Sequence, residues 1–176
     1  TADAGVCEAV VTVPQPTNSD NCGVANVVND YTGTSDASGI YPVGTTIVTW
    51  TVTDLYGNTA TCLLSVTITD DELPQIICPD NISQGSDSIS CQAFIEVPLP
   101  QTIDNCGIDS LINDYNGTAD ASGIYPQGTT NVNWYVFDVN GNSSSCSMDV
   151  TVIDNITPVI QCANDTLVNT DSNSCQ

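Results

Sequence analysis

Hydrophobic and polar residues alternate in short runs along the chain, and turn residues separate the runs. Residues 45–54 (TTIVTWTVTD) alternate around Trp50, the turn LYGN follows at 55–58, and residues 59–70 resume the alternation. The segment 91–98 (CQAFIEVP) alternates in the same way. This alternation, together with many β-branched residues and Gly/Asn turns, is typical of strands. We therefore predict an all-β chain.

The cysteines reveal an internal repeat. Cys7 recurs as Cys91 and again as Cys175, and each cysteine between them recurs at the same interval of 84 positions (91 − 7). The motif DASGIYP at 36–42 recurs at 120–126, and Trp50 recurs as Trp134. A fixed period of this length indicates tandem modules. The cysteines are Cys7, Cys22, Cys62, Cys78, Cys91, Cys106, Cys146, Cys162 and Cys175.

The length of the repeat indicates its fold. A unit of about 84 residues with about seven strands fits an immunoglobulin-like β-sandwich. We predict tandem sandwiches of this kind, with Trp50 and Trp134 in their cores. The first unit is expected to cover residues 1–72 without the N-terminal part of its repeat. The second would cover 73–156, and a third would begin within 157–176.

The charge of the chain excludes several functions. There are 21 acidic residues, no Lys, no Arg and no His, and the formal net charge is -21. No phosphate backbone or anionic lipid surface can be neutralised by such a chain, so nucleic-acid binding is not expected. His- or Lys-based catalysis is excluded by composition. No apolar run approaches the length of a membrane span, roughly 18 residues, so we expect no direct membrane insertion.

Paired carboxylates are the remaining route to catalysis. Hydrolysis of a glycoside by two acids needs them on either side of a substrate cleft. A sandwich as small as one repeat offers little cleft, and the acids recur in both repeats. We therefore predict that the chain is not an enzyme.

The cysteine spacing suggests structural disulfides. Within each unit the second and third cysteines would pair, and the remaining ones would pair across the short gap that separates Cys78 from Cys91. The rival interpretation, a thiolate metal site, lacks the short C-x-x-C spacing of zinc sites. Structural disulfides would place the protein outside the reducing cytosol. The predicted pairs are Cys22–Cys62, Cys106–Cys146, Cys78–Cys91 and Cys162–Cys175, with the partner of Cys7 outside the chain.

Strand order places two acidic features of the second unit beside the linker that leads into it. The loop at Asp104 and the turn from Asp138 to Asn142 are both expected at the end of the unit where this linker enters, which we call the linker pole. Oxygen-only, carboxylate-rich sites are what Ca²⁺ prefers. We predict that Ca²⁺ binds at each junction and stiffens it. The expected ligands are Asp70, Asp71, Glu72, Asp104, Asn105, Asp138 and Asn142, with Asp154 as the acid that the second linker retains.

A second interpretation of the same acids stays open at this point. Asp104 and Asp138 would then cap turns through backbone hydrogen bonds, and the linker acids would be solvated. The second junction favours this view, because Asp71 and Glu72 are replaced there by Asn155 and Ile156.

The second copy contains a recognisable series of motifs, at Cys78-Pro79, Cys91 to Pro100, Asp104 to Gly107, Tyr125 to Trp134, Asp138 to Asn142 and Cys146. The order of these motifs resembles the hyalin repeat (HYR) domain. The third copy departs from the pattern, with Cys162-Ala163 in place of Cys-Pro. The segment 29–54 is also similar to repeats in the giant surface adhesins of gliding bacteria of the Bacteroidota. The resemblance implies extracellular immunoglobulin-like modules that serve adhesion, without catalysis.

Sugar attachment is a further expectation for the surface. N-x-[ST] sequons matter only in a glycosylating host, and the Asp-Ser/Thr-apolar triplets resemble the O-glycosylation pattern of Bacteroidota. The candidate residues are Asn81, Asn116, Asn142, Asn155 and Asn164 for the first kind, and Ser88, Ser110 and Thr166 for the second.

The predicted function is that of a structural spacer, in which tandem modules form a stalk or filament of an extracellular, cell-surface adhesin. The expected partners are neighbouring repeats of the same chain, other copies in a filament, or an extracellular polysaccharide. The alternative is that the repeats themselves bind a ligand, such as a polysaccharide or a partner adhesin. Tyr56 is the best exposed aromatic for that role, but the second repeat has Asn140 there.

Overall fold

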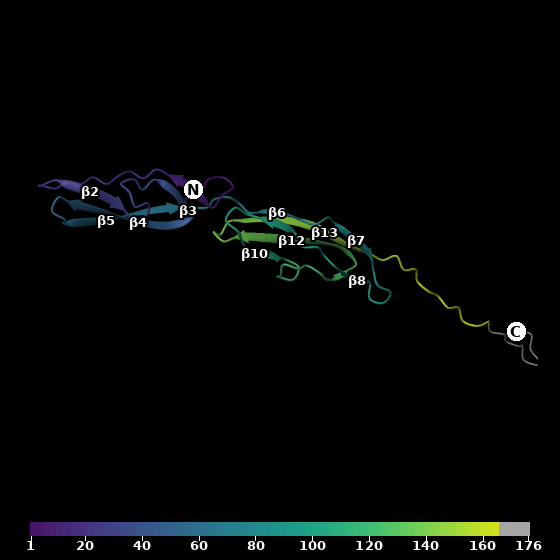
Figure 1. Cartoon of the computed structure of the whole chain (residues 1–176). Coiled ribbons are helices and arrows are strands. Elements are labelled where there is room, and N and C mark those ends of the chain that lie inside the picture. Colours follow the sequence, from purple (N-terminus) through teal and green to yellow (C-terminus); the bar gives the residue numbers. More distant parts are fainter. Residues whose placement is uncertain (166–176) are drawn as a thin grey trace, which may run out of the picture.

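The computed structural model describes residues 1–165, which form two β-sandwich modules arranged end to end (Figure 1). The chain passes from the first module to the second through a short linker at 69–74. Residues 154–165 extend from the far end of the second module without forming a strand. The prediction of tandem all-β modules is confirmed. No helix long and apolar enough to cross a membrane occurs in residues 1–165.

The first module contains five strands within residues 1–69. A hairpin of two long strands, β4 and β5, pairs with β2 to give a sheet of order β2-β4-β5, and β1 pairs with β3 on the opposite side. The bounds are β1 (Glu8–Val11), β2 (Val24–Asn29), β3 (Gly39–Pro42), β4 (Gly44–Asp54) and β5 (Thr59–Ile68).

The second module repeats this arrangement and adds three strands, two of them at its start. Its larger sheet has the order β10-β12-β13-β7, in which β7 runs parallel to β13. Two pairs, β8 with β11 and β6 with β9, complete the sandwich. The bounds are β6 (Gln75–Ile77), β7 (Ile82–Gly85), β8 (Gln92–Ile95), β9 (Gln101–Ile103), β10 (Ile108–Asn113), β11 (Gly123–Pro126), β12 (Gly128–Asp138) and β13 (Ser143–Ile153).

The alternating strand residues form the two cores. Trp50 and Trp134 are 1% and 0% exposed, as predicted, and each lies in the cluster of its own module. Tyr125 is also fully buried, and its hydroxyl donates a hydrogen bond of 2.6 Å to the carbonyl of Ala121. Such a partner removes the cost of burying a phenol. The indoles of Trp50 and Trp134 are the largest fully buried side chains of the two cores.

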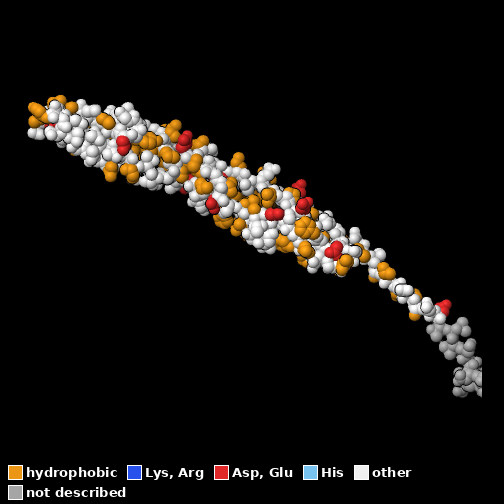
Figure 2. Space-filling model, turned by 60° about the horizontal axis from the view of Figure 1, so that its bottom comes forward, with side chains coloured by type: hydrophobic (Ala, Val, Ile, Leu, Met, Phe, Trp, Pro, Cys, Tyr) orange, Lys and Arg blue, Asp and Glu red, His pale blue; other side chains and the backbone are white. Residues whose placement is uncertain are grey.

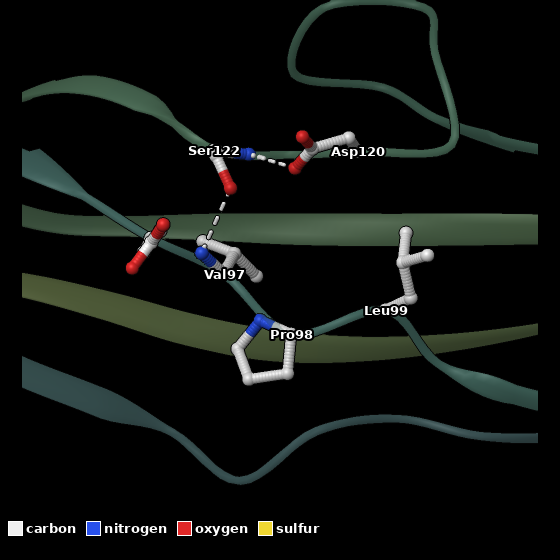
Figure 3. Close-up of a pocket in the computed structure, with 6 residues that line it drawn as sticks. Val97, Pro98, Leu99, Asp120 and Ser122 are labelled. Carbon is white, nitrogen blue, oxygen red and sulfur yellow. Dashed lines mark hydrogen bonds between the residues drawn. The ribbon is translucent and has the colours of Figure 1, made fainter.

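An acidic residue in each module caps a turn beside the core. The backbone N–H of Ser122 donates to Asp120, and the Ser122 hydroxyl accepts from the backbone N–H of Val97 (Figure 3). The first module contains the same relay, from Asp36 to Ser38. These contacts close a loop onto the segment that follows β8, so this acid has a structural role in both repeats.

The disulfides differ from the predicted pairs. Cys7 bridges Cys106, and Cys78 bridges Cys146, with Cα–Cα distances of 4.7 and 5.7 Å. Both distances are normal for disulfides. The predicted pairs Cys106–Cys146 and Cys78–Cys91 are therefore wrong, and Cys7 has its partner within the chain.

The physical reason is the position of Cys146 along its strand. Cys146 lies within β13, opposite Trp134 and four positions beyond Asn142. At about 3.3 Å per residue, this places it roughly 13 Å from the turn at the linker pole. Cys106 lies in a loop at that pole, where it meets Cys7 of the first module. Cys78 follows β6, which lies against β13.

The other cysteines in the described part of the chain are free. Cys22 and Cys62 are exposed thiols, so their predicted pairing is also wrong. Cys91 and Cys162 are exposed and free as well. Cys175, the predicted partner of Cys162, lies outside the described residues.

The surface carries acids without basic partners. In Figure 2 the Asp and Glu side chains are scattered along both modules, and no Lys, Arg or His appears among them. Because the chain has no basic side chain, its carboxylates interact only with backbone N–H groups, neutral side chains, solvent or ions from solution.

Candidate functional site: an acidic cluster at the module junction

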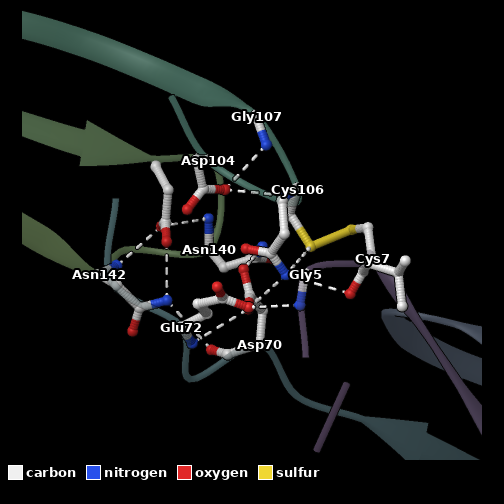
Figure 4. Close-up of a disulfide and its surroundings, with 12 residues drawn as sticks. Gly5, Cys7, Asp70, Glu72, Asp104, Cys106, Gly107, Asn140 and Asn142 are labelled. Carbon is white, nitrogen blue, oxygen red and sulfur yellow. Dashed lines mark hydrogen bonds between the residues drawn. A yellow bond between two sulfur atoms is a disulfide. The ribbon is translucent and has the colours of Figure 1, made fainter. Parts of the chain in front are cut away.

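Three segments meet where the two modules join. The linker contributes Asp70, the loop after β9 contributes Asp104, and the turn between β12 and β13 begins at Asp138. One carboxylate oxygen from each of these residues lies within 4.8 Å of the other two. Asp70 and Asp138 are buried, at 7% and 3% exposure, and Asp104 is half-buried. Figure 4 shows Asp70 and Asp104 converging beside the Cys7–Cys106 disulfide.

In each of the two loops, backbone N–H groups donate hydrogen bonds to the carboxylate of the same loop. Asp104 Oδ2 accepts from the backbone N–H groups of Cys106 and Gly107, at 2.8 and 2.9 Å. Asp138 Oδ1 accepts from the backbone N–H groups of Asn140 and Asn142, at 2.9 and 2.8 Å. The expectation that Asp104 and Asp138 cap turns is therefore confirmed. These bonds fix the direction of each carboxylate before any neighbour is considered.

Asp70 is bound by amide side chains of the second module. Its Oδ1 accepts from Asn105 Nδ2 at 3.2 Å, and its Oδ2 accepts from Asn140 Nδ2 at 2.9 Å. Its backbone carbonyl accepts from Asn142 Nδ2 at 3.1 Å. Asn105 Nδ2 also donates to the carbonyl of Val6. A single linker acid thus joins the second module to the end of the first.

Two oxygens of the cluster have no hydrogen-bond partner. Within residues 1–165, Asp104 Oδ1 and Asn105 Oδ1 are buried and accept no hydrogen bond. Burying an acceptor without a partner costs about 1–3 kcal/mol, and more for a charged group. Both oxygens belong to the loop that faces Asp70. Turn capping alone therefore leaves part of the cluster unexplained.

The charge of the cluster is also uncompensated within the chain. At an effective dielectric constant of about 20, two unit charges about 5 Å apart repel by about 3 kcal/mol. Burial acts to raise the pKa of Asp138, but hydrogen bonds from the Asn142 side chain and the turn backbone outweigh it and hold the pKa below its usual 3.8. The turn therefore favours the charged form of this acid. A cation from solution is the remaining means of neutralising the group.

The family model of the HYR domain matches residues 1–68 and again 69–152. The chain belongs to the HYR family. It is similar to hyalin of Lytechinus variegatus, with 30% identity over 172 residues, which covers 94% of this chain and 31% of that protein. It is also similar to hyalin of Strongylocentrotus purpuratus, with 29% identity, covering 93% of this chain and 14% of that protein.

A further relative is named for four other kinds of domain. The protein named Sushi, von Willebrand factor type A, EGF and pentraxin domain-containing protein 1 from Rattus norvegicus is 28% identical over 149 residues. These residues are 82% of this chain and 4% of that protein. The HYR chain therefore spans less than a third of each of these three relatives.

The HYR junction contains most, but not all, of the predicted ligands. Asp70, Asp104, Asn105, Asp138 and Asn142 are brought together. Asp71 is exposed and makes no hydrogen bond within residues 1–165. Glu72 turns toward the first module and accepts from the backbone N–H of Gly5 at 2.9 Å. Asp154, one repeat after Asp70, is exposed and accepts from the backbone N–H of Ile156.

Asn140 also lies at the junction, although it is not among the ligands predicted from the sequence. Because the first repeat has Tyr56 at this position, the residue did not look like a repeated ligand. The signal that identifies it lies within the turn itself. Asp138, Asn140 and Asn142 carry oxygen-bearing side chains at alternate positions. This spacing is found in calcium-binding loops.

The predicted sugar-attachment residues are not equivalent in the structure. Asn142 donates two hydrogen bonds at the junction and is half-buried, which argues against modification of its amide. Ser110 lies half-buried in β10. Asn81, Asn116, Asn155, Asn164 and Ser88 are exposed, and Thr166 lies outside the described residues. Modification of the exposed residues stays a prediction.

Proposed function

We propose that these HYR modules are structural spacers of an extracellular adhesion protein, and that Ca²⁺ bound between modules holds them in line. The end-to-end arrangement of two sandwiches supports the spacer role (Figure 1). The disulfides support an oxidising, extracellular location. The longest strands have 11 residues, which at about 3.3 Å per residue gives each module a length of roughly 35 Å.

The observation that carries the calcium proposal is the convergence of Asp70, Asp104 and Asp138 within 4.8 Å. Ca²⁺ binds oxygen ligands at about 2.4 Å, so two ligands on opposite sides of one ion are about 4.8 Å apart. The amide oxygens of Asn105, Asn140 and Asn142 would complete the coordination shell after their side chains reorient. Zn²⁺ prefers nitrogen and sulfur ligands, which this cluster does not offer.

The ion would act mechanically. One ligand comes from the linker and the others come from loops of the second module, so a bound ion would restrict bending between the modules. It would also cancel the repulsion among the three carboxylates. The Cys7–Cys106 bridge spans the same junction, and the two links together would keep the axes of successive modules aligned.

The test compares the wild-type chain in Ca²⁺ and in EDTA. We expect a higher thermal midpoint in Ca²⁺ and saturable binding by isothermal calorimetry. In Asp138→Asn and Asp70→Asn, the affinity for Ca²⁺ should fall by at least about tenfold, since removing a ligand charge weakens Ca²⁺ sites strongly. The matched control is Asp54→Asn, which changes the same turn position in the first module. An equal midpoint in Ca²⁺ and EDTA would rule out structural calcium.

The alternative, direct ligand binding by the repeats, has less support. Tyr56 is 78% exposed in the turn between β4 and β5, at the end of the first module opposite the linker. Its counterpart Asn140 instead contacts Asp70 across the junction. The position is thus used for contact between modules in the second repeat. Membership of a gliding-motility adhesin of the Bacteroidota stays a prediction from the repeat sequence alone.

A further inference from the structure

The turn between β12 and β13 contains a chemically reactive pair of residues. Asn140 is followed by Gly141, and both residues are exposed. The Asn-Gly sequence occurs at one other place in the chain, Asn116-Gly117. In such a pair the backbone nitrogen of the glycine can attack the side-chain amide of the asparagine, because glycine has no side chain to obstruct the approach. Asparagine is one of the thermolabile residues of proteins.

The groups that react in the β12–β13 turn are weakly held. Within residues 1–165, the side chain of Asn140 makes one hydrogen bond, from Nδ2 to Asp70 Oδ2 at 2.9 Å (Figure 4). The attacking group, the backbone N–H of Gly141, donates to the carbonyl of Asp138 over 3.4 Å. This distance is longer than that of a normal N–H···O bond. The amide and its attacker are therefore both free to move toward each other.

The other pair is held at both ends of its amide. Asn116 Oδ1 accepts from the backbone N–H and the Oγ1 of Thr118, at 3.0 and 2.9 Å, and from Asn113 Nδ2 at 3.0 Å. Asn116 Nδ2 donates to the carbonyl of Asp120 at 2.8 Å, and the N–H of Gly117 donates to the carbonyl of Asn113 at 3.0 Å. These bonds must break before the amide can turn toward Gly117. The fold therefore protects this pair and leaves the β12–β13 pair reactive.

We propose that Asn140 is a site of spontaneous deamidation, and that the carboxylate formed there makes the junction more dependent on Ca²⁺. The effect on Ca²⁺ rests on the proposed calcium function. The Gly141 nitrogen forms a bond to Asn140 Cγ, the Cγ–Nδ2 bond breaks, and the Gly141 proton leaves with Nδ2 as ammonia. Water then opens the five-membered succinimide ring to aspartate or to its β-linked isomer. One amide and one water thus become one carboxylate and one ammonium ion.

The conversion reverses the contact between position 140 and the linker. Asn140 Nδ2 donates to Asp70 Oδ2, whereas a carboxylate at position 140 can only accept. Two carboxylates then face each other where a hydrogen bond joined them. Asp70, Asp104 and Asp138 already converge here, so the new carboxylate is the fourth of the cluster. Without a cation, the conversion therefore weakens the junction.

With Ca²⁺ bound, the same charge has the opposite effect. The affinity of a Ca²⁺ site depends on the number of charged oxygen ligands. A carboxylate in place of the Asn140 amide offers the ion a charged oxygen between those of Asp138 and Asn142. The first module has Tyr56-Gly57 at the corresponding place, so its turn contains no Asn-Gly pair. The change is specific to the turn that contacts the linker.

The site of deamidation is tested by incubating the 176-residue chain at slightly alkaline pH in EDTA and mapping its peptides by mass spectrometry. Pepsin is used at acid pH, because the chain has no Lys or Arg for trypsin and acid stops further loss of ammonia. We expect conversion at Asn140 to be at least about tenfold faster than at Asn116, since more hydrogen bonds hold the second amide. In the reduced chain in urea, both pairs should convert at similar rates. Equal rates in the folded chain, or no conversion at Asn140, would overturn the proposal.

The effect on the junction is tested with Asn140→Asp. In EDTA its thermal midpoint should lie below that of freshly purified wild type, and its affinity for Ca²⁺ in calorimetry should be at least about tenfold higher. The matched control is Gln127→Glu, which makes the same change from amide to carboxylate at the opposite end of β12. Asn140→Gln keeps an amide that closes a ring far more slowly, so this variant should stay unchanged at position 140 on incubation.

The outcomes separate this proposal from the calcium function. If wild type binds no Ca²⁺, the calcium function is overturned, whereas the deamidation site is still judged by its rate and by the midpoint of Asn140→Asp in EDTA. If wild type binds Ca²⁺ and Asn140→Asp binds it equally well, the proposed effect of deamidation on the junction is overturned and the calcium function stands.

Discussion

Removal of the Cys78–Cys146 bridge should strongly lower the stability of the second module and leave the first module nearly unchanged. The two cysteines are separated by 68 positions within the second module. In the chain-entropy model, closing a loop of this length stabilises the folded state by about 4 kcal/mol. In a module of this size each kcal/mol shifts the thermal midpoint by roughly 4–8 °C, so Cys78→Ala with Cys146→Ala should lower it by roughly 15–30 °C.

The two tryptophans report on the modules separately. In a Trp50→Phe chain, fluorescence follows Trp134 and hence the second module, and in a Trp134→Phe chain it follows the first. We expect the bridge variant to shift the Trp134 transition by the full amount and to leave the Trp50 transition nearly in place. Equal shifts of both transitions, or a loss below about 1 kcal/mol, would show that this bridge does not close the second module.

Three further predictions concern single side chains. Tyr125→Phe removes a buried hydrogen bond to Ala121 and should cost about 1–2 kcal/mol in urea unfolding; the exposed Tyr135→Phe is the control, and an equal loss would refute the idea. Burial raises the pKa of Tyr125 to about 12, so its stabilisation is complete below pH 10, the unfolded value, and is lost as the pH rises toward 12. A phenolate absorbance titration in which Tyr125 ionises at its unfolded pKa would contradict this. Hydrogen bonds from the Ser122 side chain and backbone hold the pKa of Asp120 below its usual 3.8, so its contribution is present above that pH and is lost as the pH falls below it. Asp120→Asn should flatten the acid branch of the stability curve, and an acid branch equal to that of the wild type would contradict this.

The fold and the location of the acidic cluster can both be predicted from the order of the residues. The alternation around Trp50 and Trp134 is enough to specify strands with one buried face, because successive side chains of a strand point to opposite sides. The recurrence of the cysteine pattern then fixes the modular design. Strand order alone brought Asp104 and Asp138 to the linker pole, since antiparallel strands must return to the end from which they started.

The pairing of the cysteines, in contrast, depends on how the folded modules pack. Cys7 and Cys106 are separated by 99 positions and belong to different modules, so no spacing rule within one repeat pairs them. Their contact depends on how the end of one sandwich fits the next. The same fit decided that Asn140 joins the junction and that Asp71 does not. Sequence periodicity describes each module, whereas the relation between modules depends on complementary surfaces that form only after each module has folded.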